Sequence, residues 1–434
     1  MPAIYKDRYI LSASSRWDGS NLFGTKTNQK GAPLWSVGLS WDITKENWIN
    51  IDWIDYLKTR LTFGRAGNTN KLVSSLPTIV HLGQDNNTGL YSANIRSIGN
   101  PSLRWEQIST LNFGIDLRLW RGRISGNIDY YVKNAKDLIG AQILAPNTGI
   151  YTGSLAQNSN LTNYADLRTK GIDLQISSLN IEAPFHWRST LLFNYVVNEV
   201  TKFAKQNLLS IGYYSLNPSP AVQGESRDML YAIPWNGLSP DDGQQIIYID
   251  GVASHDYAKY YNGLKKEDLV AVGASVPPFY GSLRNEVSYK GFGISALVSF
   301  KSGYFFRRES TDPTAILNSQ LNYHMDYLDR WQKSGDELKS TVPSRTDIYN
   351  SYSAQIYNFS EPLVTKGDHI RLQDISISYT FPKKKSGIPN IRFYGYAKNL
   401  GIIWRSNRKG IDPDFFNNEF VAPKTYAIGL QVNF

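Results

Sequence analysis

The residues of this chain that could bind metals or transfer protons are scattered, and their spacing builds no familiar site. The five histidines are His81, His186, His255, His324 and His369. None has the short, regular spacing of metal ligands on one turn or loop. We therefore expect each of them on a surface connection between strands and predict no metal site.

Other sequence signatures of catalysis are also missing. Asp241-Asp242-Gly243 and Asp250-Gly251 could suggest calcium, but the closing Glu of a calcium loop does not follow, so we interpret both as turns. The sequence has no phosphate-binding G-x-x-x-x-G-K-[ST] loop and no G-x-S-x-G elbow. It also has no cysteine, which excludes thiolate chemistry and suits an envelope protein. We predict neither an enzyme nor a cofactor.

The composition narrows the class of protein further. Only 19% of the 434 residues are charged, while 13% are aromatic. The net charge of +9 is dispersed, and the single basic run, Lys383–Lys385, gives no reason to predict a nucleic-acid partner. No stretch approaches the ~20 apolar residues of a membrane-spanning helix. These features leave a soluble β-protein or a membrane β-barrel.

Apolar and polar residues alternate along several segments of the chain. Between Trp35 and Thr44 the odd positions are apolar and the even positions small or polar, and Ser109–Leu119 and residues 425–434 repeat the pattern. Successive side chains of a strand point to opposite faces, so each segment would have one apolar and one polar face. The pattern predicts about twelve strands, at residues 8–17, 34–44, 56–65, 109–119, 122–134, 170–179, 187–199, 280–289, 292–300, 370–381, 391–400 and 425–434.

Strand length and connection length favour a membrane barrel. Most predicted strands exceed the usual ~5–6 residues of soluble strands and reach the ~9–11 needed to cross a bilayer at a tilt. Short and long connections alternate along the chain, and Trp120-Arg121-Gly122 and Lys290-Gly291 look like tight turns. Outer-membrane barrels have short periplasmic turns and long extracellular loops. The long connections hold about twice as many residues as the strands, which is too many loop residues for a twelve-strand barrel. We therefore expect these strands to be part of a wider barrel of ~22 strands.

In such a barrel the apolar faces would contact lipid and the polar faces would line the lumen. Five aromatic residues near the expected strand ends, Trp35, Trp41, Trp120, Tyr130 and Tyr426, suit the aromatic girdle at a membrane interface. The alternative is ordinary aromatic packing in a core.

Short motifs follow one another in a fixed order. They are RWDGSNLFG at 16–24, LTFGRAGN at 61–68, NPSLRWE at 100–106, DYYVKNAKDL at 129–138, GDHIRLQDISISY at 367–379, AKNL at 397–400 and GIDPD at 410–414. In this order and spacing they resemble the C-terminal barrel half of the SusC/RagA-like TonB-linked outer-membrane receptors.

This resemblance implies import of large nutrients, such as oligosaccharides or peptides, across the outer membrane of a Gram-negative bacterium. It also implies a SusD-like surface lipoprotein as a lid and energy from the TonB–ExbB–ExbD complex. Residues 1–434 would be the C-terminal portion of the barrel. The signal peptide, regulatory domain, TonB-contacting segment, plug and first strands of the family are not found here, so we expect the chain to be a fragment.

Aromatic residues in the two longest connections are the best candidates for binding a glycan or peptide, because aromatic faces commonly line ligand sites. The candidates are Tyr213, Tyr214, Tyr231, Trp235, Tyr304 and Trp331. The alternative is that these rings pack the loops themselves or contact a lid protein.

The last strand ends on Phe434 and also carries Tyr426. A terminal aromatic residue on an alternating strand resembles the signal that the outer-membrane barrel assembly machinery recognises. The alternative is a plain last strand without a signalling role.

Two other interpretations of the whole chain remain open on the sequence. The alternating strands could form a self-sufficient twelve-strand porin or adhesin. They could also form a soluble carbohydrate-binding β-protein, since the strands of a soluble sandwich alternate too.

Overall fold

The computed structural model describes residues 2–20, 31–49, 51–68, 76–142, 160–204, 211–214, 221–311, 324–344, 351–381, 390–417 and 420–433. These residues divide into two compact units. Unit 1 comprises residues 1–180, 190–207 and 221–226, and unit 2 comprises residues 181–189, 208–220 and 227–434. Lys383–Lys385 and Phe434 lie outside the described residues.

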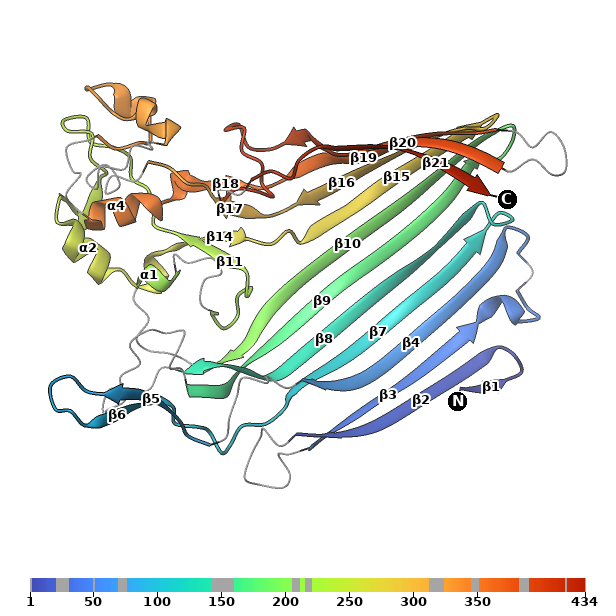
Figure 1. The fold of residues 1–434 in the computed structure, drawn as a ribbon, viewed down its shortest axis with the longest axis horizontal. Coiled ribbons are helices and arrows are strands. Elements are labelled where there is room, and N and C mark those ends of the chain that lie inside the picture. Colours follow the sequence, from blue (N-terminus) through green and yellow to red (C-terminus); the bar gives the residue numbers. More distant parts are fainter. Residues whose placement is uncertain are drawn as a thin grey trace. The chain divides into compact units, whose positions relative to one another are not determined.

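Long strands dominate both units and neighbour one another in chain order (Figure 1). Thirteen strands of the described residues belong to this sheet, and all pairings whose register is defined are antiparallel. In order they are β1 (Ala3–Tyr5), β2 (Tyr9–Gly19), β3 (Gly31–Asp42), β4 (Ile54–Asn68), β7 (Glu106–Leu119), β8 (Ile124–Gln142), β9 (Asn160–Ile181), β10 (Phe185–Phe203), β15 (Phe279–Tyr289), β16 (Phe292–Ser302), β19 (His369–Thr380), β20 (Asn390–Arg405) and β21 (Thr425–Asn433).

All twelve strands predicted from the sequence are confirmed, and β1 is an additional short one. The prediction was wrong about the lengths of several strands: β8, β9 and β10 have 19, 22 and 19 residues, and β4 and β20 have 15 and 16. A tilted strand needs only ~9–11 residues to cross the bilayer. Most of the extra residues lie at the ends joined by long connections, where both faces of a strand can be polar and the alternation fades.

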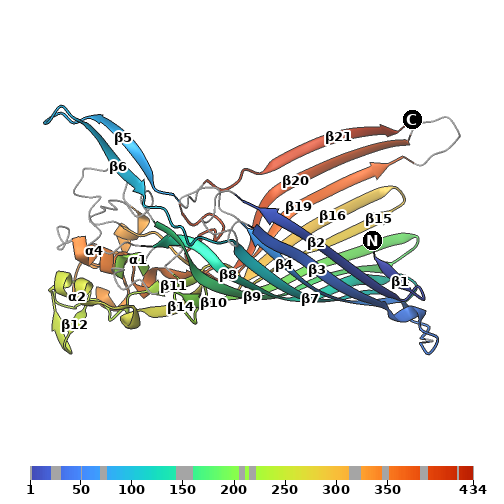
Figure 2. The same ribbon diagram turned by 90° about the horizontal axis from the view of Figure 1, so that it is seen from below.

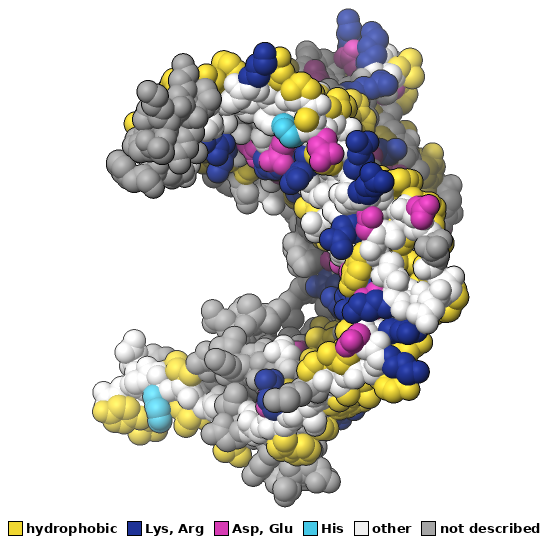
Figure 3. All heavy atoms as spheres, turned by 90° about the vertical axis from the view of Figure 1, so that its right-hand side faces the viewer, with side chains coloured by type: hydrophobic (Ala, Val, Ile, Leu, Met, Phe, Trp, Pro, Cys, Tyr) yellow, Lys and Arg dark blue, Asp and Glu magenta, His cyan; other side chains and the backbone are white. Residues whose placement is uncertain are grey.

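The alternation places one continuous apolar row across the strands of unit 1. Directly paired positions on successive strands all carry large apolar side chains, and every one of them is exposed: Leu11, Leu39, Leu61, Phe113, Tyr130 and Ile172. Figure 3 shows patches of hydrophobic side chains (yellow) on the surface seen from the right-hand side of Figure 1, with charged side chains (blue and magenta) between them. Exposed contiguous apolar surface of this kind marks a face that contacts something other than water.

The two tight turns expected from the sequence are confirmed. Trp120, Arg121 and Gly122 have positive φ angles of 54°, 58° and 78° between β7 and β8. Lys290 and Gly291 have φ angles of 46° and 89°, and they alone connect β15 and β16. Two successive left-handed residues form the turn whose twist matches that of the flanking strands.

The predicted aromatic girdle residues lie at the surface. Trp35, Trp120, Tyr130 and Tyr426 are exposed, and Trp120 stacks on Trp53 with ring centroids 5.5 Å apart. Trp41 is half-buried, and its indole nitrogen donates a hydrogen bond to Glu46 at 3.0 Å.

The long connections contain structure that the alternation did not predict. In unit 1, β5 (Thr78–Gln84) and β6 (Tyr91–Ser97) form a hairpin between β4 and β7, which Figure 2 shows clearly. In unit 2 the short elements are α1 (Ile211–Tyr214), β11 (Met229–Ala232), β12 (Ile247–Ile249), β13 (Val252–Ser254), α2 (Tyr257–Gly263), β14 (Val270–Ala274), β17 (Phe305–Arg307), α4 (Ser351–Asn358) and β18 (Val364–Lys366). None of the helices in the described ranges is long and apolar enough to cross a membrane.

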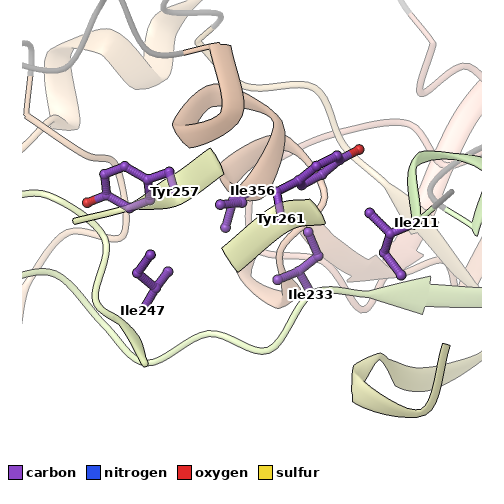
Figure 4. Close-up of a cluster of buried hydrophobic side chains, with 6 residues drawn as sticks. All are labelled: Ile211, Ile233, Ile247, Tyr257, Tyr261 and Ile356. Atoms are coloured by element: carbon purple, nitrogen blue, oxygen red, sulfur yellow. The ribbon is translucent and has the colours of Figure 1, made fainter. Parts of the chain in front are cut away.

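The short elements of unit 2 share a hydrophobic core of their own. We call the packed residues 211–214, 229–274, 304–311, 324–344 and 351–366 the loop canopy. Its core brings together side chains from both of the longest connections (Figure 4): Ile211, Ile233, Ile247, Tyr257, Tyr261 and Ile356. Segments more than a hundred residues apart in sequence are therefore fixed to each other by apolar burial.

Candidate functional site: the polar face and the loop canopy

The polar face of unit 1 carries a compact charged cluster, here called the Arg60 cluster. Arg60 donates to Asp116 through Nε at 2.9 Å and Nη2 at 3.0 Å, and Nη2 also reaches Asp129 at 3.2 Å. Asn112 and Asn127 donate to Asp129 at 2.9 Å and 3.1 Å. Each residue comes from β4, β7 or β8, so the cluster joins three strands on the face opposite the apolar row.

The polar face of unit 2 depends on a bulge in β19. Leu297 of β16 pairs with Asp374, but the next residue, Val298, pairs with Leu372. The extra residue, Gln373, shifts the alternation by one position. As a result Leu372 and the later apolar residues of β19 lie on one face, while Asp374 lies on the polar face and accepts from Arg284 at 3.3 Å.

At the end of β19 nearest the long connections, five ionisable residues form a second cluster. Lys301 Nζ lies 2.6 Å from Asp414, and Arg371 Nη2 lies 2.5 Å from Asp412 and 3.0 Å from Asp414. His369 is 1% exposed, and its Nε2 lies 3.3 Å from Asp414. We call these residues the C-terminal ion cluster. It ties the connection of residues 406–424, between β20 and β21, to β16 and β19.

The C-terminal ion cluster sets the charge of Asp414. Burial works to raise the pKa of Asp414, but hydrogen bonds from His369 and Lys301 outweigh it and hold that pKa well below its ordinary range. Asp414 therefore stays ionised at neutral pH and can orient the side chains of Lys301, Arg371 and His369.

A hollow opens beside this cluster on the polar face. Its volume is about 330 Å³, at the lower end of the ~300–1,000 Å³ typical of small-molecule sites. The lining residues come from β16, β19, β20 and the 406–424 connection: Lys301, Arg371, Gln373, Asn399, Asp414, Phe415, Val421 and Ala422. The guanidinium of Arg371 lies over the Phe415 ring, 5.9 Å from its centroid.

Two of the predicted ligand-binding aromatics contact each other in the loop canopy. Tyr214 meets Tyr231 edge to face, with centroids 5.8 Å apart. Tyr231 is only 1% exposed, and its carbonyl accepts a hydrogen bond from Arg307 at 2.5 Å. Burial lowers the pKa of Arg307 to about 10.

The other described candidates pack against separate neighbours. Trp235 lies against Tyr357, with ring centroids 6.1 Å apart. Tyr304 is 4% exposed, and burial raises the pKa of its phenol. Trp331 donates from its indole nitrogen to Glu337 at 3.1 Å.

The ligand-binding role of these aromatics stays a prediction. The burial of Tyr231 and Tyr304 favours the alternative in which the rings hold the canopy together. The side chain of Tyr213 lies outside the described residues, as does Phe434. Tyr426 is 68% exposed on β21, and its part in barrel assembly also stays a prediction.

The expectation that all five histidines lie on connections was wrong for two. His186 lies in β10 and His369 begins β19, whereas His81 lies in the β5–β6 hairpin of the connection between β4 and β7. His369 escaped notice because its neighbours in the C-terminal ion cluster are far away in sequence. A signal was available, since Arg371 and Asp412 stand in two of the motifs that carry the family resemblance, with opposite charges. Within the described residues, no group of three acidic or histidine side chains is placed to hold a metal ion.

Comparison with known proteins identifies the class that this two-faced sheet belongs to. The family model described as "TonB dependent receptor-like, beta-barrel" matches residues 3–400. The chain belongs to this family. Its sheet is accordingly part of an antiparallel transmembrane β-barrel, and its place is the outer membrane of a Gram-negative bacterium.

Individual relatives share this similarity over nearly the whole chain. The TonB-dependent receptor SusC of Bacteroides thetaiotaomicron is 30% identical over 99% of the chain and 42% of its own length. The TonB-dependent receptor P26 of Formosa agariphila is 24% identical over 99% of the chain and 45% of its length. The RagAB peptide importer in a closed state superposes with a TM-score of 0.78 at 21% identity, covering 99% of the chain and 46% of that protein's chain. The chain thus spans about half the length of the relatives it matches.

Proposed function

We propose that residues 1–434 are the C-terminal portion of the barrel of a receptor that imports an oligosaccharide or a peptide across the outer membrane. The role would be transport and not catalysis. The observation that carries this proposal is the two-faced sheet: exposed apolar rows on one face, charged clusters on the other, and a packed canopy on the long connections. The similarity to SusC supports it at the level of sequence.

In this proposal the two faces of the sheet have different roles, one in contact with lipid and one lining the passage. The apolar face holds the strands in lipid, because backbone groups in a bilayer must be paired within a closed sheet. The polar face lines the passage, and the loop canopy with a SusD-like lipoprotein captures the nutrient outside. TonB–ExbB–ExbD would supply the energy by acting on parts of the receptor other than the barrel. The barrel assembly machinery would insert the strands.

Uptake measurements test the proposal. The receptor gene would be deleted from its bacterium, and entry of labelled oligosaccharides and labelled peptides would be followed in cells with and without TonB. We expect one ligand class to lose uptake in both mutants. Uptake that survives the loss of TonB, or that is unchanged without the receptor, would contradict the proposal.

The lipoprotein partner is tested separately. A tagged receptor extracted in mild detergent should carry a lipid-modified surface protein in equal amount. Removing the packed core of the canopy, for example with Ile356→Asp, should release that protein while the barrel stays folded. Extraction of the receptor alone would count against a lid partner.

A further inference from the structure

The hollow beside the C-terminal ion cluster contains hydrogen-bonding groups that contacts within the described residues do not use. Lys301 donates one hydrogen bond to Asp414, and an ammonium has three N–H groups. Its side chain is 42% exposed, so the remaining N–H groups can reach a ligand. The amide of Gln373 donates to Ser299 at 2.7 Å, and that of Asn399 donates to the Pro423 carbonyl at 3.0 Å.

Those two amides leave their carbonyl oxygens available. Among contacts within the described parts of the chain, neither Gln373 Oε1 nor Asn399 Oδ1 accepts a hydrogen bond. The lining therefore offers donors from Lys301 and acceptors from two amides within one small space. A ligand that only accepts, or only donates, would leave half of these groups unpaired, which costs binding energy.

The charged groups of the hollow are already paired with one another. Lys301 and Arg371 both line it and both contact Asp414, and Arg371 also contacts Asp412. A carboxylate or phosphate would have to compete with Asp414 for both cations and would be repelled by it. A neutral ligand avoids this cost.

One wall of the hollow is aromatic. Phe415 lines it, and the guanidinium of Arg371 lies over one face of its ring. Because Asp414 is anchored to β16 and β19, the neighbouring Phe415 is positioned without help from a ligand. An aromatic wall beside mixed donors and acceptors suits a ring that has an apolar C–H face and a rim of hydroxyl groups.

We propose that this hollow binds a neutral sugar residue of the imported molecule. Each sugar hydroxyl both donates and accepts, so it can satisfy Lys301 and the Gln373 and Asn399 carbonyls together. The inference rests on the proposed import function and narrows its substrate from oligosaccharide or peptide to oligosaccharide.

Two adjacent phenylalanines provide a matched test. Phe415 lines the hollow, whereas Phe416 packs on buried Phe306 with ring centroids 5.0 Å apart. The full-length receptor, extracted from outer membranes in mild detergent, would be incubated with two probes: a pool of short neutral oligosaccharides released from plant and algal polysaccharides, and a pool of tryptic peptides. Retained molecules would be identified by mass spectrometry, and the affinity for each retained molecule would be measured by titration.

We expect the unaltered receptor to retain members of the sugar pool, and Phe415→Ala to weaken their binding roughly tenfold. Phe416→Ala should bind as the unaltered receptor does. Gln373→Met, which keeps the side-chain length, should weaken binding severalfold. The heat-modifiable band on gels would verify that each variant is folded.

Three outcomes would overturn the inference. They are retention of peptides alone, retention of neither pool, and sugar binding that Phe415→Ala and Gln373→Met leave unchanged. None of these outcomes touches the proposed import function, which stands or falls on TonB-dependent uptake in cells.

Discussion

Gly114 determines whether the Arg60 cluster can form. A Cβ atom at this position would lie 2.5 Å from Asp129 Oδ1 and 2.7 Å from Arg60 Nη2, closer than real contacts allow. The Arg60 and Asp129 side chains can meet over the middle strand here because Gly114 carries no side chain. We predict that Gly114→Ala lowers the free energy of unfolding by about 1–3 kcal/mol, because the two side-chain ends must move apart and lose their charged hydrogen bonds.

The measurement is the temperature at which the folded, heat-modifiable band is lost in detergent. Gly395→Ala is the matched control, because a Cβ there meets only the Ala427 carbonyl at an ordinary 3.6 Å. If both variants melted at the same temperature, the Arg60 cluster would not contribute as described.

Asp414 gives the C-terminal ion cluster a defined pH dependence. Its pKa in the folded protein is depressed, so its contribution is fully present above its ordinary pKa of 3.8 and is lost as the pH falls below that value. We predict that the 406–424 connection loosens below about pH 4 in the unaltered protein.

A spin label tests this, because the chain has no competing cysteine. Val421→Cys, at a site that is 56% exposed, would carry the label, and its mobility would be recorded against pH. Adding Asp414→Asn should raise the mobility at neutral pH and remove the pH response. Equal mobility with and without Asp414→Asn at neutral pH would contradict the prediction.

At the scale of the element, the bulge in β19 keeps the apolar residues of both halves of the strand on the same face of the sheet. If Gln373 paired as an ordinary residue instead of bulging, the residues before it would turn over: Ile370 and Leu372 would face the lumen, and His369 and Arg371 would face lipid. Deleting Gln373 removes the extra residue and leaves Leu372 and Asp374 on opposite faces, so we predict that this variant still assembles. Deleting Ser376, which lies in the regularly paired part of the strand, should turn one half of β19 over and prevent assembly of the barrel.

The readout is the amount of heat-modifiable protein in outer-membrane fractions. Normal assembly after the deletion of Ser376 would mean that β19 tolerates either register, and its division into a lipid face and a lumen face would be wrong.

Strand positions could be predicted from the sequence because the bilayer imposes a period of two. Leu111, Phe113 and Ile115 alternate with polar neighbours for that reason. The outer ends of β8 and β9 could not be predicted, since residues such as Asp137 and Asn163 lie where neither face requires apolar side chains. The bulge at Gln373 could not be predicted either, because a single extra polar residue interrupts the alternation of β19 at only one position.

The candidate site was less predictable than the fold for a related reason. Its contacts join residues distant in sequence, such as Lys301 and Asp414, and no local period marks them. Tyr231, one of the aromatics chosen from the loops, is buried in the canopy, whereas the hollow is lined by strand residues and by one connection. Composition could suggest which loops matter but not which side chains they enclose.

At the scale of the whole molecule, the surroundings of the sheet determine whether its exposed apolar face is stable. Leu61 and Phe63 on β4 and Ile377 on β19 are exposed large apolar residues, while Thr62, Ser376 and Ser378 point to the opposite face. In water such a surface would be a liability. In a lipid bilayer it is the requirement for staying in the membrane.

The most direct test places a single nitroxide label at each of these positions in the outer membrane, which the cysteine-free sequence permits. Collision with oxygen reports lipid, and collision with a water-soluble nickel complex reports the lumen. We predict that labels at 61, 63 and 377 favour oxygen, whereas labels at 62, 376 and 378 favour the nickel complex. Accessibility that does not alternate along β4 and β19 would contradict the account.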